Sequence, residues 1–204
     1  LDMPSQIRGV QNASAMTESI YFIKLAERNF EELLEKEYLG PIDVHEAIGH
    51  AEIYNDINEA VDAKKIDLIV MGSHGASGFK ELFIGSNTEK VVRTAKVPVL
   101  VIKNDHSQLE INDFVFATDF SEESRWSLRE AQKFAKVVGA KMHLLYVNTP
   151  AGFKTTEDAN ELMENFVRGI GAENSTLNIH NAFSVEKGIL HFAKMKNAQL
   201  VGMS

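Results

Sequence analysis

The sequence contains no cysteine among its 204 residues, and this absence excludes several kinds of chemistry. Without cysteine there is no disulfide framework, no thiolate nucleophile and no cysteine-ligated zinc or iron–sulfur centre. No apolar run approaches the roughly 20 residues of a membrane span. The first residues also lack the basic start and apolar stretch of a signal peptide. We therefore expect a protein of a reducing, aqueous compartment, the cytoplasm.

Basic residues are in short supply as well. The chain has 21 Lys and Arg against 29 Asp and Glu, which gives a net charge of −8. Sequence-independent binding to nucleic acid needs clustered basic side chains, so we expect no nucleic-acid partner. We expect no membrane partner either. The 44% of apolar and 25% of charged residues are ordinary for a globular protein that buries a core.

Short apolar runs alternate with segments of helical periodicity. The run 68–71 is continuously apolar between charged and glycine-rich flanks, which is typical of a strand buried on both faces of a parallel sheet. This alternation predicts an α/β fold with a parallel sheet. The expected strands are 42–48, 68–71, 97–102, 114–117, 142–147, 177–183 and 200–201, and the expected helices are 13–38, 55–65, 86–96, 121–138, 158–170 and 185–196.

The element order repeats along the chain. A shift of 131 positions places residues 44–73 over 175–204, so that Val70 meets Val201 and Ser73 meets Ser204. Identity across this shift is low, but the order of elements agrees. We therefore expect two similar α/β units, residues 1–104 and 113–204, joined by a polar linker at 105–112.

A glycine-rich loop is the strongest chemical feature. Gly-Ser-His-Gly at 72–75 is followed, after nine residues, by Gly-Ser-Asn-Thr at 85–88, between a buried strand and a helix. Glycine allows a ligand to approach the backbone closely, and N–H groups at a helix start favour an anion. The hydroxyls of Ser86 and Thr88 can donate to phosphate oxygens. Ser86 and Glu89 also fit a capping box, so from spacing alone phosphate binding and plain helix capping both stay open.

These residues, with the strand 97–101, resemble the universal stress protein family. Its nucleotide-binding members share the pattern Gly-x-x-Gly, nine residues, Gly-Ser/Thr, which this sequence matches in full. The second unit resembles the opening of the same family, because 116–121 would end a first strand and 145–147 a second. The resemblance covers essentially the whole chain, as a tandem pair.

The resemblance implies a Rossmann-like, adenine nucleotide alpha hydrolase-like fold. This is a doubly wound, five-stranded parallel sheet of strand order 3-2-1-4-5 with helices on both faces. It implies ATP, AMP or ADP as ligand, with or without Mg²⁺, and a stress-response role through binding and association rather than turnover. Asp119 would be the adenosine-side acid of the second unit. The phosphate contacts carried over are Gly72, Ser73, His74, Gly75, Gly85, Ser86, Asn87 and Thr88, with Ser73, His74 and Asn87 offering backbone N–H groups more than side chains.

The sequence also departs from the family pattern. By the resemblance, the first unit lacks its first strand and helix, and the second lacks its glycine loop and last strand, so both units are expected to be truncated. The repeat places Met203 opposite Gly72, where a methionine side chain would crowd a phosphate. We therefore expect the second nucleotide site to be degenerate or empty.

Two other functions stay open. One is a scaffold of the same fold that binds no nucleotide and works through its dimer surface. The other is an ATP-using enzyme of a related fold, although no catalytic residues are identified. In the resembling family the last strands of two domains pair, so 97–102 is expected to form a homodimer or an intramolecular pseudo-dimer. A less favoured alternative is a permuted assembly, in which the first two strands of the second unit complete the sheet of the first.

The histidines are not expected to bind metal. His45 and His50 stand five apart, whereas the zinc-protease motif needs two histidines four apart on one helix face. His143, His180 and His191 are isolated in the sequence. The sequence therefore predicts no metal site.

Overall fold

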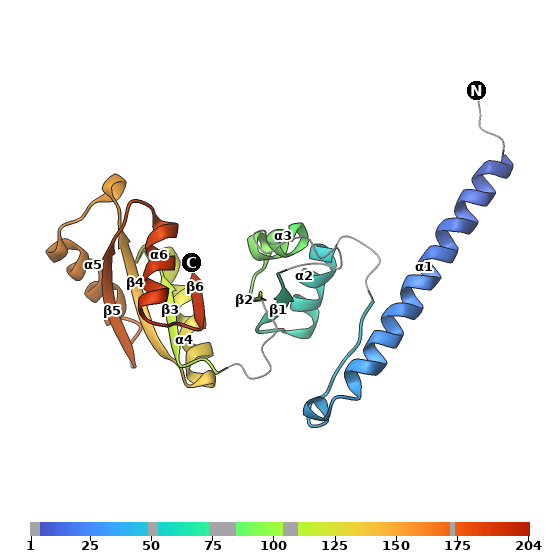
Figure 1. The fold of residues 1–204 in the computed structure, drawn as a ribbon, viewed down its shortest axis with the longest axis horizontal. Coiled ribbons are helices and arrows are strands. Elements are labelled where there is room, and N and C mark those ends of the chain that lie inside the picture. Colours follow the sequence, from blue (N-terminus) through green and yellow to red (C-terminus); the bar gives the residue numbers. More distant parts are fainter. Residues whose placement is uncertain (1–4, 49–52, 74–84, 104–109, 172–173) are drawn as a thin grey trace. The chain divides into compact units, whose positions relative to one another are not determined.

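The computed structural model describes the chain apart from residues 1–4, 49–52, 74–84, 104–109 and 172–173, with only the backbone described for 5–19 and 53–54 (Figure 1). The chain divides into two compact units, residues 1–63 and 64–204, and each is described here by itself. Helix α1 covers Ser5–Leu34, a 3₁₀ turn covers Glu37–Leu39, and α2 covers Ile53–Lys64.

The first unit is mostly helical. Helix α1 starts earlier and ends earlier than the predicted range 13–38, and its described side chains are exposed or half-buried. The predicted strand 42–48 is wrong, because this segment is irregular in the structure. All of its side chains except the half-buried Val44 are exposed. A strand is stabilised by a paired neighbour and a buried face, and this segment has neither among the described residues.

The compact unit formed by residues 64–204 contains a small sheet of two parallel strands. Strand β1 (Ile69–Gly72) pairs with β2 (Val99–Ile102), with Ile69 opposite Val99 and Gly72 opposite Ile102. Helix α3 (Ser86–Thr94) connects them. The Ile69 N–H donates to the Pro98 carbonyl at 3.0 Å, so the proline lies just before β2, where its missing N–H costs nothing.

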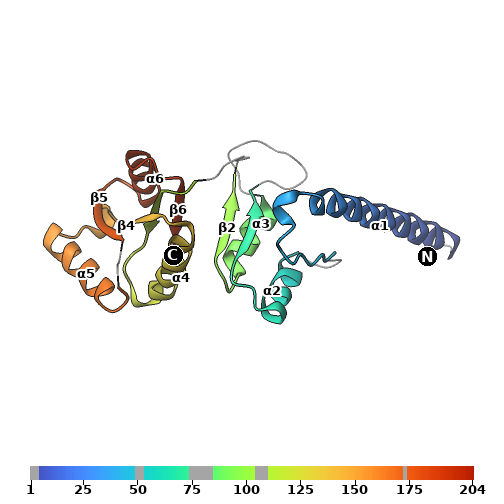
Figure 2. The same cartoon turned by 90° about the horizontal axis from the view of Figure 1, so that it is seen from below.

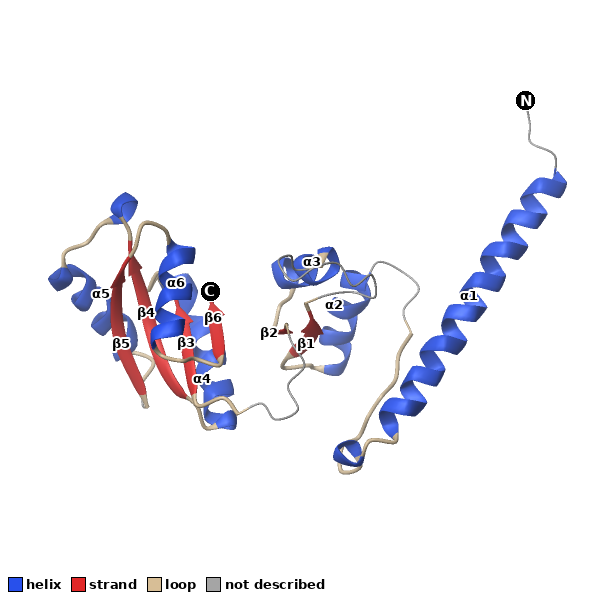
Figure 3. Cartoon of the chain, viewed as in Figure 1, coloured by secondary structure: helices blue, strands red, loops and turns tan. Residues whose placement is uncertain are grey.

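A four-stranded parallel sheet forms the rest of the second unit, in the order β5-β4-β3-β6 (Figure 3). Helices α4 and α5 cover one face and α6 covers the other (Figure 2). The strands are β3 (Asp113–Ala117), β4 (Lys141–Asn148), β5 (Ser175–Asn181) and β6 (Leu200–Met203). The helices are α4 (Arg125–Val138), α5 (Thr156–Arg168) and α6 (Val185–Met195), with 3₁₀ turns at Glu122–Ser124 and Pro150–Gly152.

The core lies on both faces of β3. Phe114 and Phe116 pack into the cluster under α4 and α5, whereas Val115 and Ala117 pack into the cluster under α6. Because successive side chains of a strand point to opposite faces, a strand covered on both sides must be apolar throughout. The α/β fold with parallel strands is thus confirmed.

The helix ends follow their sequence cues in part. Gly139 ends α4 with a φ of +72°, a left-handed conformation that glycine adopts without strain. The helix predicted over 121–138 begins later, because the Ser121 side chain makes no capping bond and a 3₁₀ turn intervenes. The helix starts instead at Arg125, whose guanidinium donates to Glu122 at 2.7 Å and to the Phe166 carbonyl at 2.8 Å.

The predicted five-stranded sheet of order 3-2-1-4-5 is not confirmed, because the described residues form two separate sheets of two and four strands. Numbered by themselves, the strands of the larger sheet follow the order 3-2-1-4. The bounds of β1 and β6 differ by the 131 positions of the sequence repeat at both ends. Helix α2 and helix α6 end 131 positions apart as well.

The contact between α6 and β4 depends on Gly188. A Cβ atom at this position would overlap Cγ1 of Val147 and lie 3.0 Å from the Cβ of Ala182. Alanine normally favours a helix over glycine, but here we expect Gly188→Ala to lower the free energy of unfolding by about 1–3 kcal/mol through overpacking. Chemical denaturation measures this change. The control is Gly152→Ala, where nothing lies within 4 Å of the added atom. Equal stability of the two variants would contradict the prediction.

Candidate functional site

The two ends of the glycine-rich loop meet at the carboxyl edge of the β1–β2 sheet. The Ser73 N–H donates to the Ile102 carbonyl at 2.9 Å, which extends the pairing one residue beyond β1. The Gly85 N–H then donates to the Ser73 carbonyl at 2.8 Å. Residues 72–73 and 85 are therefore fixed beside each other. In open α/β sheets this edge is where ligands bind.

Helix α3 begins at this edge, and no described side chain caps its N-terminus. Gly85 is its N-cap and supplies no side chain, and the Glu89 N–H donates to the Gly85 carbonyl at 3.0 Å. The capping box considered from the sequence is not formed. Ser86 is the first helical residue and is exposed, and Glu89 pairs with Arg93 at 3.0 Å. The first-turn N–H groups of 86–88 thus keep the positive end of the helix dipole available to an anion.

Thr88 has a role that the sequence did not predict. Its side chain is buried, and its hydroxyl donates to the Gly72 carbonyl at 3.0 Å. The hydroxyl proton is therefore committed to the end of β1, and in this conformation it does not point to a phosphate. Thr88 instead positions the helix start, while Ser86 and Asn87 are exposed at the same edge. His74 and Gly75 lie outside the described residues.

Asp119 follows β3 at the carboxyl edge of the larger sheet. Its Oδ1 accepts from the Ser121 N–H at 2.9 Å and from the Ser124 hydroxyl at 2.8 Å. The Ser121 N–H is the main cause that lowers the pKa of Asp119 below its ordinary value, against a smaller opposing effect of burial. Both of these hydrogen bonds go to Oδ1, and the residue is exposed, so its carboxylate can be reached by a ligand hydroxyl.

The sequence analysis missed a chain of hydroxyls beside Asp119. The Ser204 hydroxyl oxygen lies within hydrogen-bond distance of Thr118 Oγ1, at 3.0 Å, and of Ser124 Oγ, at 3.1 Å. These contacts join the end of β6 to the end of β3. The sequence repeat gave a hint, since it pairs Ser204 with Ser73 at the end of β1, but the side-chain partners are 80 and 86 residues apart in the sequence.

The turn after Asp119 is conformationally strained. Phe120 has a φ of +60°, which a bulky side chain rarely adopts. Its ring is buried edge-on against Tyr146 and Phe166, with centroids 6.2 and 5.3 Å away. Burial, and secondarily the charge of Asp119, raise the pKa of Tyr146. The buried ring holds the strained turn and so fixes the direction of the Asp119 carboxylate.

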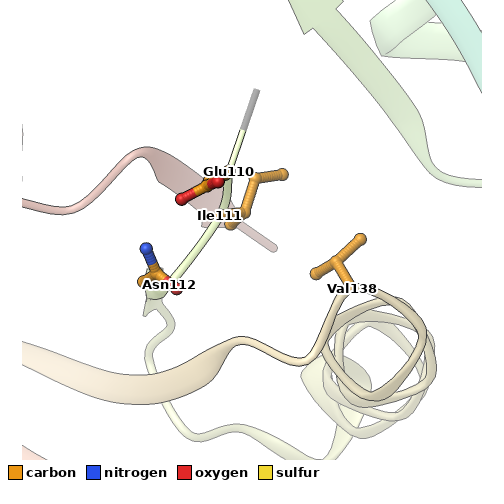
Figure 4. A pocket seen from close by; sticks show the side chains of 4 residues that line it. All are labelled: Glu110, Ile111, Asn112 and Val138. Carbon is orange, nitrogen blue, oxygen red and sulfur yellow. The ribbon is translucent and has the colours of Figure 1, made fainter. Parts of the chain in front are cut away.

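Two hollows lie on opposite edges of the larger sheet. At the carboxyl edge, a hollow of about 530 Å³ is lined by Asn148, Thr149, Pro150, Phe153, Asn181, Ala182 and Phe183. Asn148 closes its floor, since its amide binds the backbone of Lys154 at 3.0 Å and Asn181 Oδ1 at 3.1 Å. The second hollow, about 360 Å³, lies where Glu110–Asn112 lead into β3 beside Val138 (Figure 4). It is at the amino edge and belongs to no predicted site.

Comparison with known proteins decides the family. Residues 4–103 match the universal stress protein family. Universal stress protein MJ0577 of Methanocaldococcus jannaschii is 39% identical over 54 residues, which are 26% of this chain and 33% of that protein. Universal stress protein Slr1230 of Synechocystis is 33% identical over 102 residues, 50% of this chain and 33% of that protein. Residues 4–103 of this chain are therefore assigned to the universal stress protein family.

The structural comparison agrees. A universal stress protein from Archaeoglobus fulgidus superposes with a TM-score of 0.66 and 27% identity, covering all of this chain and 68% of that one. A putative universal stress protein from Pseudomonas aeruginosa, 18% identical, shares the fold with a TM-score of 0.57 over 91% of this chain and 66% of its own. The chain spans about a third of the length of the curated relatives it matches.

Two negative findings hold for the described part of this chain. None of its described helices is both long and apolar enough to cross a membrane. Its described residues also contain no cluster of three or more histidine or acidic side chains that could hold a metal ion. Of the two histidines compared with the zinc-protease motif, His45 is exposed and lies 3.3 Å from Asp43, and His50 is outside the described residues.

The lowered pKa of Asp119 predicts a pH dependence of stability. A carboxylate whose folded pKa is depressed stabilises the folded state above its unfolded pKa of about 3.9, and this contribution is lost as pH falls through the folded value. We therefore expect Asp119→Asn to be less stable than wild type near neutral pH, with the gap closing at acid pH. Thermal unfolding from about pH 7 to about pH 3 tests it. Glu164→Gln, on the exposed face of α5, is the control. A gap independent of pH would contradict the assignment.

Proposed function

We propose that this chain binds an adenine nucleotide and acts by binding and association rather than by turnover. The observation that carries the proposal is the closed base of the glycine-rich loop, where Gly85 bonds to Ser73 and Thr88 bonds to Gly72 at the start of α3. The proposal is supported by the position of Gly72, Ser73 and Gly85, which lie beside one another at one edge. Backbone N–H groups at this edge suit a polyphosphate, with Mg²⁺ as an optional counterion.

The acidic balance of the chain agrees with this mode of binding. With a net charge of −8, a phosphate must be held by local backbone groups and the helix end, since no basic surface is predicted. The proposed phosphate contacts are the backbone of Gly72, Ser73, His74, Gly75, Gly85 and Asn87 and both the backbone and hydroxyl of Ser86. Thr88 is proposed as the residue that positions α3.

Asp119 is proposed as the acid that accepts a hydrogen bond from a ribose hydroxyl. Asp119 is exposed, and the turn that carries it is held by the buried ring of Phe120. Carboxylates at this edge of nucleotide-binding α/β sheets commonly bind ribose. The two sheets are proposed to be parts of tandem units, which the matching bounds of β1 and β6 support.

A negative charge introduced at the start of α3 should lower nucleotide affinity without lowering the stability of the fold. Ser86→Asp puts a carboxylate at an exposed first-turn position, where it favours the helix dipole but repels phosphate. We expect unchanged or slightly higher thermal stability and nucleotide affinity lowered by about tenfold or more. Equilibrium binding of a fluorescent ATP analogue measures the affinity. The matched control is Asn165→Asp, which adds the same charge at an exposed position of α5. Equal affinity in wild type and both variants would overturn the site.

Scaffold function without nucleotide is the second candidate, and the free edge of β2 favours it. Among the described residues β2 pairs only with β1, and its other edge carries the apolar run Val99–Ile102. Such an edge recruits another strand unless it is protected. Association through this edge, as a homodimer or an intramolecular pseudo-dimer, is compatible with nucleotide binding and is proposed alongside it.

A proline tests the edge without touching the β1–β2 pairing. In a parallel pair, alternate residues direct their N–H groups to opposite sides, and Ile69 bonding to Pro98 assigns Val101 to the free side. We expect Val101→Pro to shift an associated species to monomer in sedimentation experiments while the β1–β2 sheet persists. The control is Val137→Lys, which changes an exposed valine on α4 and should leave the associated species unchanged. A wild-type chain that is monomeric at all concentrations would contradict association.

A further inference from the structure

Two histidines that are isolated in the sequence meet in the structure. His180 lies in β5 and His191 in α6, on the face of the larger sheet that α6 covers. Nε2 of His180 and Nδ1 of His191 are 2.9 Å apart, with the ring centroids separated by 5.0 Å. His180 is half-buried and His191 is exposed, so a solute can reach both rings from solvent.

The pair is held by rigid neighbours. His180 stands opposite Val147 in the β4–β5 ladder, and its ring lies 5.9 Å from that of Phe192, which is buried in the core. Helix α6 is fixed at its start by the Ser184 side chain, which accepts from the Lys187 N–H. Ligands placed on a strand and a helix keep their separation better than ligands on loops.

The contact places a lone pair between the two rings. A hydrogen bond between two imidazole nitrogens needs a proton on one nitrogen and a lone pair on the other, so at least one of the two facing nitrogens carries a lone pair. Neutral imidazole nitrogens are common metal ligands.

We propose that His180 and His191 together form a binding site for a divalent transition-metal ion of the Cu²⁺ or Ni²⁺ class. Two metal–nitrogen bonds of about 2.0 Å drawn from atoms 2.9 Å apart meet at about 90°. That angle belongs to square-planar or octahedral coordination, whereas a tetrahedral zinc site would hold the nitrogens about 3.3 Å apart. On binding, the shared proton moves to the outer nitrogen of its ring, and the metal replaces the hydrogen bond. Water fills the remaining positions.

The ligand atoms of the pair, which are two imidazole nitrogens, do not suit hard cations. The described residues place no cluster of carboxylates there. Ca²⁺ and Mg²⁺ depend on anionic oxygen ligands, so they have nothing to bind. A metal that bonds to neutral imidazole is the ligand that fits.

Calorimetric titration of the full chain with Ni²⁺, Cu²⁺, Zn²⁺ and Mg²⁺ tests the proposal. We expect one equivalent of Ni²⁺ or Cu²⁺ to bind more tightly than Zn²⁺, and no heat with Mg²⁺. His180→Asn and His191→Asn each remove one of the two protein ligands and should weaken that equivalent by about tenfold or more. His45→Asn, at an exposed histidine of the first unit, should leave it unchanged.

A second measurement uses only the wild-type chain, so it does not depend on whether the variants fold. In an NMR titration, paramagnetic Ni²⁺ should broaden the amide signals of β5 and α6 first. Broadening centred elsewhere, absence of binding at millimolar metal, or unchanged affinity in both folded histidine variants would each overturn the proposal. Nucleotide is absent from these experiments, so their outcome is independent of the proposed nucleotide site.

Discussion

Strand β3 is the element on which the larger sheet depends. It pairs in parallel with β4 on one side and β6 on the other, and Val115 at its centre has no exposed surface. A strand buried on both faces and both edges can carry function only where it ends. The chemistry of this part of the molecule therefore gathers at Thr118 and Asp119, just beyond the last paired residue.

Parallel pairing extends the same constraint to the smaller sheet. All carboxyl ends of a parallel sheet meet at one edge, so β1 delivers Gly72 and Ser73 to the edge where α3 begins. The two sheets differ in the polar groups that they present at this edge. The smaller relies on backbone groups and the helix end, whereas the larger relies on a carboxylate and a chain of hydroxyls from Thr118, Ser124 and Ser204.

Much of the fold was predictable because apolar runs and glycines act locally. The runs at 68–71 and 114–117 predicted strands within a residue or two, and Gly139 predicted the end of α4. The strand predicted at 42–48 was wrong, because alternation without a pairing partner does not make a strand. The start of α4 was misplaced for a similar reason. Arg125 is held by Phe166, 41 residues away, and no local pattern records that contact.

The sequence by itself determined the α/β class, the family resemblance and the candidate loop, because spacing and residue type are enough to express them. Tertiary structure alone decided what each polar side chain does. It assigned the Thr88 hydroxyl to Gly72, joined Ser204 to Thr118, and placed His180 against His191. These partners come from different elements, and their contacts exist only once packing has fixed the distances between strands and helices.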